Sequence, residues 1–437
     1  MVNGKDWKAK ARWIIQGWED PELLQLDRSS PTANTLSLHL LLQVCASMKW
    51  DLTLADIKTA FLTADAKERD QPLYSELPPG GISGIDAGSL LQLLKPIYGQ
   101  VDAPLHFFNT LKNYLVNQCG MRQSKLDPCM FTQHDSKNNI SGMIVTTVDD
   151  LAMCGDNHAM KIVYDLLKQR FKFGTWKVGG GRYCGRDIIQ HADKSISVNQ
   201  HADIMKLETI TLPRGRLQQQ DAECLDEEVS MLRSRVGGLS WFVNQTRMDC
   251  AGDVSFIQKV FPNPSISAVT EVNRIIRRMQ KEEVTLTFQC IPMKELRFLL
   301  STDAGWANVD QTKSQAGWMV CAVHSDIQND KTVLFSPIVW KSHTIKRVTS
   351  STLSSETMAL SEGLSELDWI LALWAETLNA HFSIKDFSDG VYQQHASVHL
   401  GQSISDDIQT TLNNVTCVTD CKSVYDVINK DTVPHDK

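Results

Sequence analysis

The stretch GMIVTTVDDLAMC, residues 142–154, contains two adjacent aspartates, Asp149 and Asp150, between two runs of apolar and β-branched residues. Such runs on either side of a short polar break are typical of two antiparallel strands joined by a tight turn. We therefore expect a β-hairpin that presents both carboxylates at its tip. Neighbouring carboxylates repel each other, so keeping both ionised is costly unless a cation lies between them. The hairpin therefore indicates either a metal site or an ordinary polar turn.

A third carboxylate belongs to the same hypothesis. Asp56 comes near the end of residues 51–57, in which Leu52, Leu54 and Ile57 alternate with other residues as in a half-buried strand. Three carboxylates from neighbouring strands would supply the oxygen ligands that Mg²⁺ prefers. Two such ions lower the pKa of an attacking hydroxyl and stabilise a pyrophosphate leaving group. Asp56, Asp149 and Asp150 are therefore our first set of candidate metal ligands.

A second set lies in the last third of the chain. Asp303 ends a strand-like run, Glu356 lies in the first turn of a long expected helix, and Asp420 follows the β-rich residues 415–418. Acids brought together from a strand, a helix and another strand are what a two-metal nuclease needs. The plainer interpretation of each acid is a solvated or helix-capping residue.

The composition limits the class of protein. The chain has 437 residues, 42% hydrophobic and 22% charged, which is ordinary for a globular protein and excludes a disordered or collagen-like chain. A net charge of −7 argues against indiscriminate binding to nucleic acid, although it leaves room for a local basic groove. We see no secretory signal and no stretch long enough to span a bilayer, so no membrane partner is expected. Eleven cysteines at irregular spacings indicate reduced thiols in a cytosolic or nuclear protein.

Apolar periodicity predicts helices and strands in alternation along the chain. We expect a basic strand at residues 8–16, further strands at 51–57 and around the hairpin, and a new β-rich region from residue 295. The expected helices are residues 30–49, which begin with a Ser-Ser-Pro start signal, and residues 105–118, 158–171, 229–246, 265–281 and 354–378. A polar stretch at 380–414 is expected to be an inserted loop.

Several motifs in the first half resemble, in order and spacing, the reverse transcriptase of copia-type LTR retrotransposons. They are DIKTAFL at 56–62, LKPIYGQVDAP at 94–104, DPCMF at 127–131 and VDDL at 148–151. In the second half, TDAGWA at 302–307, KS at 313–314 with GW at 317–318, WKS at 340–342 and SETMA at 355–359 look like an RNase H domain. The resemblance extends from Lys10 to Asp420.

The resemblance implies an α+β fold in which a right-hand polymerase palm with partial fingers is followed by a helical connection and an RNase H-like α/β domain. It implies three regions: fingers and palm at 1–205, thumb or connection at 206–292, and RNase H-like domain at 293–437 with an insertion near 380–414. Both ends of the sequence look cut, and a fourth nuclease ligand is expected beyond Lys437. The chain is therefore expected to be an interior segment of a Pol polyprotein.

The resemblance also implies residue roles. Asp56, Asp149 and Asp150 would be the polymerase metal ligands and catalytic acids, and Asp303, Glu356 and Asp420 those of the nuclease, with two Mg²⁺ ions in each site, for which Mn²⁺ may substitute. The residues expected to bind the incoming nucleotide are Lys10, Arg12, Phe61, Tyr98 and Gly99. The primer grip is expected at Tyr183, Cys184 and Gly185. The plainer alternatives are a core aromatic for Phe61 and a simple hairpin turn for residues 183–185.

These expectations define an RNA-directed DNA polymerase with possible RNase H activity. Its expected partners are an RNA template, a DNA primer, an RNA–DNA hybrid, deoxynucleoside triphosphates and other domains of the Pol polyprotein. It is expected in the cytoplasm, in a virus-like particle, or in the nucleus. Two alternatives stay open: a truncated or decayed copy that binds nucleic acid without turnover, and a nucleic-acid-binding scaffold adopted by the host. We expect weak or absent hybrid cleavage, because the fourth ligand is missing.

Overall fold

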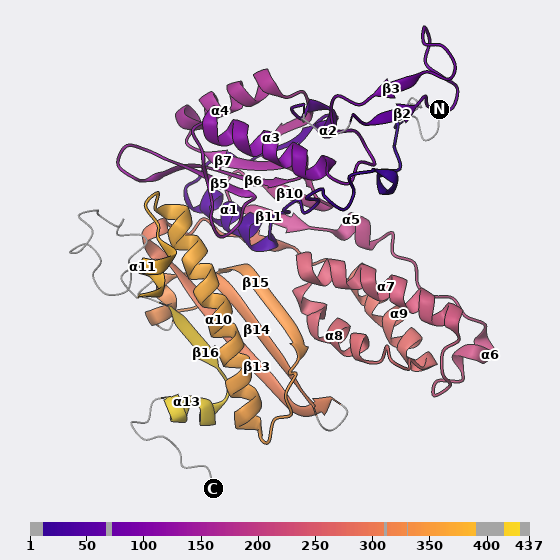
Figure 1. Cartoon of the computed structure of the whole chain (residues 1–437). Helices are drawn as coiled ribbons and strands as arrows, with labels where there is room; N and C mark the ends of the chain where they lie inside the picture. Colours follow the sequence, from indigo (N-terminus) through magenta and orange to yellow (C-terminus); the bar gives the residue numbers. More distant parts are fainter. Residues whose placement is uncertain (1–11, 67–71, 310–312, 330, 390–414, 429–437) are drawn as a thin grey trace.

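The computed structural model describes residues 12–66, 72–309, 313–329, 331–389 and 415–428. Three parts follow one another along the chain: a unit of sheets and helices, a group of helices, and a second unit of sheet and helix (Figure 1). The coarse α+β class is therefore confirmed. Within the described ranges, no helix combines the length and the apolar character needed to cross a bilayer.

The first sheet is antiparallel and has six strands. In spatial order they are β4 (Arg122–Gln123), β5 (Met130–His134), β6 (Ile140–Thr147), β7 (Asp150–Gly155), β1 (Thr53–Ile57) and β8 (Phe173–Val178). The expected hairpin around the two aspartates is β6 and β7. The strand expected at 51–57 is β1, which pairs directly with β7.

Helices cover both faces of this sheet. They are α1 (Thr35–Ser47) on one face and α3 (Ala103–Asn117) and α4 (Asn157–Arg170) on the other. Successive residues of a strand point to opposite faces, so Met143 and Val145 of β6 pack with α1, whereas Ile144 packs with α3 and α4. Burial on both faces explains why the hairpin reads as nearly continuous apolar sequence.

Helix α1 begins later than expected. Its N-cap is Asn34, whose side chain accepts a hydrogen bond from Leu36 N, and the backbone N–H of Asn34 donates to Asp127 Oδ2 at 3.0 Å. The prediction of a start at Ser-Ser-Pro was therefore wrong. An asparagine side chain caps a helix as well as serine does, and Asp127 fixes the approach of the chain here.

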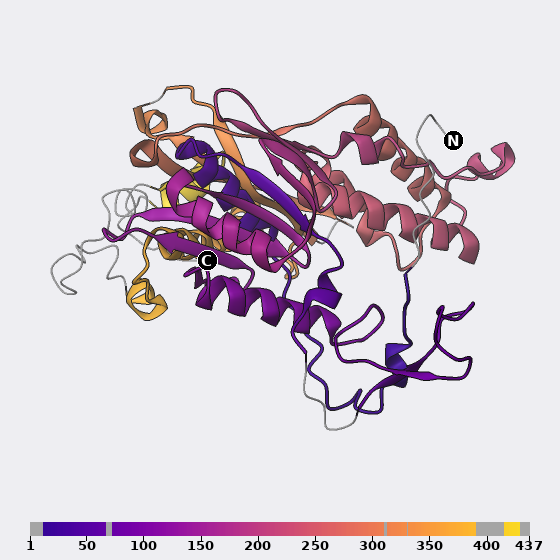
Figure 2. The same cartoon turned by 90° about the horizontal axis from the view of Figure 1, so that it is seen from above.

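A slender extension stands apart from the sheets. It contains η1 (Gly17–Glu19) and a two-stranded ribbon of β2 (Tyr74–Glu76) and β3 (Leu90–Gln92), and it projects away from the rest of the molecule (Figure 2). The short helix α2 (Ala60–Thr63) follows β1 at the base of this region. The strand expected at 8–16 is not present in its described part, residues 12–16, where Ile15 N donates one backbone hydrogen bond to Tyr98 O.

A second antiparallel sheet has four short strands: β9 (Gly180–Tyr183), β10 (Arg186–Gln190), β11 (Ile196–Asn199) and β12 (Leu286–Phe288). The short helix α5 (His201–Ile204) follows β11. Strand β12 pairs with β11 although the helical part lies between them in the sequence. The chain therefore leaves this sheet, forms the helices and returns to it, across the expected boundary at 205–206.

The helical part contains α6 (Arg214–Leu217), α7 (Asp226–Gln245), η2 (Met248–Cys250), α8 (Ala251–Lys259) and α9 (Ile266–Lys281). Two of these, α7 and α9, correspond to the expected helices, whereas α8 was not expected. Arg247 marks the break before α8. Its side chain is only 1% exposed and bonds to both carboxylate oxygens of Asp249, at 2.8 Å each, and to Met279 O at 2.7 Å.

The last unit follows η3 (Met293–Glu295) and has a mixed four-stranded sheet in the order β15 (Phe335–Thr344), β14 (Lys313–His324), β13 (Leu296–Val309) and β16 (Thr416–Thr419), with η4 (Ser325–Asn329) after β14. Strand β16 runs parallel to β13, whereas the other pairs are antiparallel. The long helix α10 (Thr352–Leu378) covers this sheet, followed by α11 (Ile384–Ser388) and, after β16, by α13 (Lys422–Ile428). Part of the expected loop, 380–389, contains α11, and residues 390–414 lie outside the described residues.

The first and last units share one core. A single cluster of buried apolar side chains includes Leu40 and Leu41 of α1, Phe288 of β12 and Trp374 of α10, all fully buried. His39 of α1 is also fully buried, and its Nδ1 lies 2.8 Å from Ile338 O. The two units therefore pack as parts of one body.

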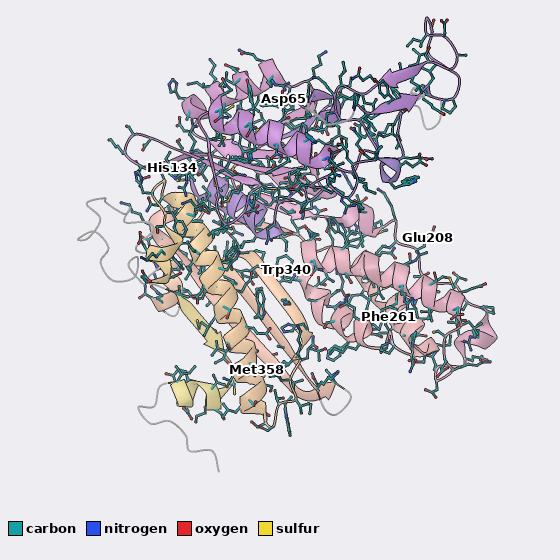
Figure 3. All side chains as sticks on the ribbon, in the orientation of Figure 1. Asp65, His134, Glu208, Phe261, Trp340 and Met358 are labelled. Atoms are coloured by element: carbon teal, nitrogen blue, oxygen red, sulfur yellow. The ribbon has the colours of Figure 1, made fainter. Side chains whose placement is uncertain are left out.

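Trp340 of β15 connects this body to the helical part. Its ring stacks against His39 at 5.9 Å between centroids, and its Nε1 donates to Val243 O at 2.9 Å. Figure 3 shows Trp340 where the last sheet faces the helices. All three parts of the chain therefore meet at one side chain.

Candidate catalytic sites: two groups of carboxylates

The first group of acids lies where the hairpin meets β1. Asp56 of β1 pairs with Asp150, the first residue of β7, and Asp149 occupies the turn. The backbone N–H of Ile57 donates to Asp149 O at 2.9 Å, which ties the turn to β1. Val148 adopts φ 55°, the left-handed conformation that this tight turn requires of a non-glycine residue. The structure therefore brings the backbones of all three expected acids together.

The charges at this first site are mutually unfavourable. Burial raises the pKa of Asp149, and the nearby carboxylates of Asp150 and Asp56 raise it further. Burial also raises the pKa of Asp150, with Asp56 acting in the same direction, while a hydrogen bond from the Cys184 thiol opposes the shift. That thiol lies 3.3 Å from Asp150 Oδ2. A bound cation would remove this cost, so the residues fit a metal site.

The residues expected to bind a nucleotide gather beside this site. The Arg12 guanidinium lies 5.3 Å from the ring centroid of Tyr98, and the Phe61 ring packs edge-on against Tyr98 at 5.2 Å. Arg12 also lowers the pKa of Asp149. Gly99 has φ 95°, and a Cβ there would overlap Ile15 O, so a glycine is required. Lys10 lies outside the described residues.

The position of Phe61 is compatible with both expected roles, contact with a nucleotide and packing in the core. Its ring also contacts Phe107, in the core under α3, at 6.4 Å, and the side chain is partly buried. It therefore lies at the edge of the core and next to Tyr98 at once.

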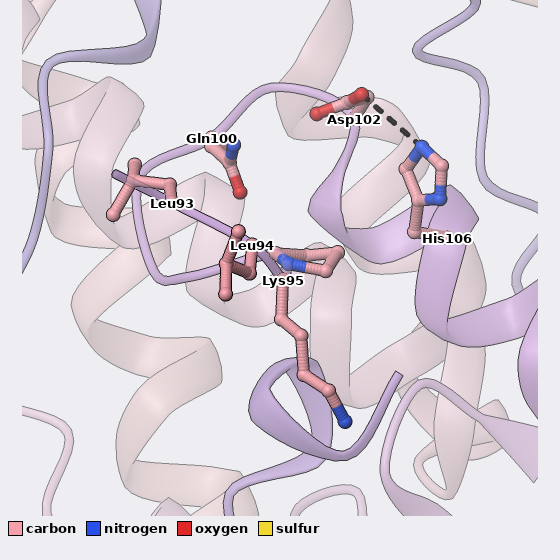
Figure 4. Close-up of a pocket in the computed structure, with 7 residues that line it drawn as sticks. Leu93, Leu94, Lys95, Gln100, Asp102 and His106 are labelled. Carbon is pink, nitrogen blue, oxygen red and sulfur yellow. Dashed lines mark ion pairs between the residues drawn. The ribbon is translucent and has the colours of Figure 1, made fainter. Parts of the chain in front are cut away.

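A small pocket adjoins the motif at 94–104. Figure 4 shows it beside Lys95 and Gln100, with the ion pair of His106 Nε2 and Asp102 Oδ2 at 3.2 Å on one side. The cavity is about 10 Å³, which accommodates one water molecule at most. This pocket is therefore too small to hold a nucleotide.

The turn expected to be the primer grip packs against the hairpin. Tyr183 is 2% exposed, and its hydroxyl lies 3.0 Å from Thr147 Oγ1 and 3.4 Å from Val145 O. Cys184 and Gly185 adopt φ 44° and 77° in the turn between β9 and β10. The side chains of Tyr183 and Cys184 are thus directed at the hairpin, which is compatible with a plain turn as well as with a grip made by the backbone.

The second group of acids is more compact. Thr302 of β13 pairs with Thr419 of β16 in parallel, so Asp303 and Asp420 follow side by side, and Glu356 reaches them from the first turn of α10. Ligand oxygens of these three acids lie within 4.8 Å of one another, and no other such group of three His, Cys, Asp or Glu side chains occurs among the described residues.

Glu356 is the acid of this second group whose charge is least favourable. It is 4% exposed, and its Oε2 has no hydrogen-bond partner among the described residues. Burial raises its pKa, the backbone N–H of Ala304 opposes the shift, and the charges of Asp303 and Asp420 add to it. An unpartnered buried carboxylate oxygen beside two more carboxylates is the arrangement that a divalent cation satisfies.

Two contacts escaped the sequence analysis. The thiol of Cys184, named from the sequence only as part of the expected primer grip, lies against the candidate metal ligand Asp150, and Arg186, which was not named, is buried directly after the turn. No local pattern predicts either contact, because both depend on how β9 and β10 pack against the hairpin. A groove of about 400 Å³ beside Asp303, between η2 and the last sheet, also joins parts far apart in sequence.

Comparison with known proteins places the first half of the chain in a family. Residues 2–211 match the family described as reverse transcriptase (RNA-dependent DNA polymerase). The chain is 25% identical over 386 residues to the retrovirus-related Pol polyprotein from transposon TNT 1-94 of Nicotiana tabacum, covering 83% of this chain and 27% of that protein. It is 24% identical over 345 residues to the transposon Ty1-BL Gag-Pol polyprotein of Saccharomyces cerevisiae, covering 72% and 19%.

Among solved structures, the foamy viral protease-reverse transcriptase in complex with RNA/DNA hybrid matches with a TM-score of 0.42 and 12% identity, over 94% of this chain and 48% of that chain. Residues 2–211, just under half of the chain, are similar to the reverse transcriptase family, and the relatives that the chain matches are Pol polyproteins of copia-type transposons. More particularly, the chain is homologous to a segment of retrotransposon Pol polyproteins. It spans about a quarter of the length of the tobacco relative, 27%.

Proposed function

We propose that this chain acts as the RNA-directed DNA polymerase of a retrotransposon Pol polyprotein. Its substrates are an RNA template, a DNA primer and deoxynucleoside triphosphates, and its site of action is a cytoplasmic particle or the nucleus. The observation that carries the proposal is the pairing of Asp56 with Asp150 beside Asp149, inside the segment that matches reverse transcriptases.

In this proposal the six-stranded sheet with α3 and α4 is the palm, and the extension with β2 and β3 is the partial fingers. The helices α7 to α9 are the thumb or connection, and the last unit is the RNase H-like domain. The expected regions 1–205, 206–292 and 293–437 follow this division, except that β12 returns to the sheet of β9 to β11.

Asp56, Asp149 and Asp150 would hold two Mg²⁺ ions, which when bound lower the pKa of the primer 3′ hydroxyl and stabilise the leaving pyrophosphate. Arg12 lies where its charge reaches Asp149 and the face of Tyr98, so it suits the triphosphate of an incoming nucleotide. The ring of Phe61 beside Tyr98 suits contact with the sugar. Cys184 holds Asp150 in place from the opposite side.

The second group of acids supports a second reaction. Asp303, Glu356 and Asp420 would hold Mg²⁺ and cleave the RNA strand of an RNA–DNA hybrid. The sequence alone led us to expect weak or absent hybrid cleavage. The short distances between these three acids support cleavage more strongly than the sequence pattern does.

The test is primer extension on an RNA template with Mg²⁺, comparing the wild type with Asp149→Asn. We expect the variant to lose roughly 10³-fold in incorporation rate, because a missing ligand removes several kcal/mol of metal-dependent stabilisation. Asp165→Asn, an exposed carboxylate on α4, is the matched control and should extend primers normally.

Equal extension by the wild type and Asp149→Asn would refute the proposal. Absence of extension by the wild type would also refute it, and would favour a decayed copy or an adopted scaffold if the hybrid still bound.

A further inference from the structure

A second cleft opens beside the first group of acids. It has a volume of about 280 Å³ and lies between the start of α1, the end of β6, the turn after β9 and the helix α7. Its walls include Thr35, Thr147, Arg186, Trp241 and Gln245. The cleft is close to the acids, because Thr147 and Cys184 line it and the Cys184 thiol contacts Asp150 at 3.3 Å.

Arg186 is a buried cation that lacks an anion. Its residue exposure is 5%, and among the described residues its one hydrogen bond goes from Nη2 to Thr35 Oγ1 at 3.5 Å. Its Nε is buried and has no partner within the described residues, and no carboxylate there forms an ion pair with it. Burial lowers the pKa of Arg186, as expected for a buried guanidinium with no carboxylate beside it among the described residues.

Arg247 shows what a satisfied buried arginine looks like in this chain. It is 1% exposed and binds both oxygens of Asp249 and a backbone carbonyl. The two arginines are equally deep, yet only Arg247 has its charge neutralised by the protein. Because an unpaired buried charge is costly, the position of Arg186 beside a cleft points to an anion supplied from outside.

The other walls of the cleft limit which anion fits. A guanidinium matches the oxygens of a phosphate in a two-pronged geometry. Trp241 of α7 is 48% exposed and presents a flat apolar surface of the kind on which sugars and bases pack. Thr35 and Gln245, whose side chains are 3.3 Å apart, add uncharged polar groups. A phosphate that carries sugars and bases fits this set better than a free phosphate does.

We propose that Arg186 and Trp241 form a binding site for one phosphodiester group of a nucleic acid strand and its adjoining nucleotide. The proposal rests on the proposed polymerase function, since it places a strand beside the first group of acids. In this proposal the guanidinium of Arg186 contacts the phosphate, because the Tyr183 hydroxyl and the Cys184 thiol already form hydrogen bonds with residues of the hairpin.

The experiment measures binding of the full chain to a fluorescent DNA primer on an RNA template, without divalent metal, over a range of salt concentrations. We expect Arg186→Gln to bind roughly tenfold more weakly and to reduce the slope of log affinity against log salt by about one. Trp241→Ala should weaken binding by roughly fivefold or more with an unchanged slope. Arg214→Gln removes an exposed charge at the far end of the helical part and is the matched control.

Thermal unfolding separates this role from a structural one. Arg186→Met should keep or raise the Tm of the free protein, since it removes an unpaired buried charge, whereas Arg247→Met should lower it. Unchanged affinity and slope for Arg186→Gln would overturn the proposal, even if the wild type extends primers. A Tm for Arg186→Met as low as that of Arg247→Met would overturn it too, since Arg186 would then be structural.

Pyrophosphate distinguishes the source of the phosphate. If pyrophosphate raises the Tm of the wild type but not of Arg186→Met, while primer–template affinity is the same for both, the site takes a free phosphate and the strand assignment is wrong. Failure of the wild type to extend any primer, with the Arg186 effects on binding intact, would instead refute only the polymerase function.

Discussion

The two groups of acids are built in opposite ways. At the first site, two antiparallel strands and a hairpin turn align Asp56, Asp149 and Asp150, and burial together with the neighbouring charges raises the pKa of Asp149 and Asp150. At the second, a parallel strand pair and a helix bring Asp303, Glu356 and Asp420 within 4.8 Å. The first site has neighbours that hold its ligands from outside, such as Cys184. At the second site, the backbone N–H of Ala304 acts on Glu356, while Glu356 Oε2 has no hydrogen-bond partner among the described residues.

Comparing the two groups shows that acids adjacent in the sequence need not have their carboxylate oxygens close together in the structure. Asp149 and Asp150 are adjacent in the chain, yet their group does not meet the ligand spacing that the second group meets. Asp149 lies in the turn and Asp150 begins β7, so their adjacency in the chain does not bring their carboxylates to one point, whereas Asp303 and Asp420 follow a parallel strand pair side by side. A metal would have to draw the first group together, while the second is already assembled.

The largest expected effect tests whether the two sites are independent. We predict that Glu356→Gln loses roughly 10³-fold in hybrid cleavage while primer extension stays at the wild-type rate. The measurement is cleavage of a labelled RNA–DNA hybrid beside extension in the same buffer. Glu366→Gln, a partly exposed carboxylate on the same helix, is the control. Robust cleavage by Glu356→Gln would remove the second group from catalysis.

The next prediction concerns the contact that holds the two sites in one body. Glu376 of α10 is 1% exposed and accepts from Arg122 Nη2 at 3.2 Å, Ser124 Oγ at 2.5 Å and Lys125 N at 2.8 Å, all near β4. Glu376→Ala removes a buried acceptor and leaves the buried hydroxyl of Ser124 without it, while Arg122 is only partly buried and keeps its bond to Asn379 O, so it should lower the free energy of unfolding by about 1–3 kcal/mol. Urea denaturation measures the loss. A change below about 1 kcal/mol would mean that the units separate easily.

A smaller effect should fall on the first site alone. Gly174 of β8 lies against Asp56, and a Cβ at this position would overlap Asp56 Oδ2. Its backbone is not in the left-handed region, so Gly174→Ala should fold normally while displacing the carboxylate. We predict a loss of roughly 10- to 100-fold in primer extension, as for residues that orient a metal ligand, with unchanged hybrid cleavage. Gly237→Ala on α7, where a Cβ meets open space, is the control.

The smallest effect is on stability and its dependence on pH. The folded protein raises the pKa of Asp149, Asp150 and Glu356 above the ordinary range, so the folded state holds more protons than the unfolded state as these groups titrate. Their contribution to stability is therefore present at low pH and is lost as the pH rises through the raised pKa values. We predict that Asp149→Asn raises the Tm in metal-free buffer at pH 8 by roughly 1–3 °C.

The same substitution should change the Tm less as the pH falls, because protonation then removes the charge of the Asp149 carboxyl in the wild type. Added Mg²⁺ should raise the Tm of the wild type more than that of the variant. A lower Tm for Asp149→Asn at pH 8 would show that the charge is stabilised by the protein itself.

Much of this architecture could be predicted from the sequence. The hairpin, β1 and the helices α3, α4, α7, α9 and α10 were expected within a few residues, because their apolar patterns are long and regular. The four-stranded sheet of β9 to β12 and the helix α8 were not, since short elements carry little periodicity and β12 pairs with a strand from before the helices. The strand expected at 8–16 is absent from its described part, residues 12–16, because a basic apolar run is also compatible with an extended segment that makes one hydrogen bond to Tyr98.

The candidate site residues also include some that could be predicted from the sequence and some that could not. All six acids were named from sequence, and the structure places them in two groups of three, although their catalytic roles stay predictions. Arg186 could not be found this way, because what marks it is burial without a carboxylate partner among the described residues, and burial of a single charged residue on a strand is decided by elements elsewhere in the chain. The same holds for Glu376, whose donors lie about 250 residues earlier.

The shared core has a consequence for how the chain is made. His39 in α1 contacts Ile338, 299 residues later, and the same face of α1 packs against β12 and β15. At a synthesis rate of roughly 5–20 residues per second, α1 leaves the ribosome some 15–60 s before the strand that covers it. The first unit is therefore left with an apolar face exposed until β15 is made, and a defect in β15 is expected to appear first as aggregation of the nascent N-terminal half.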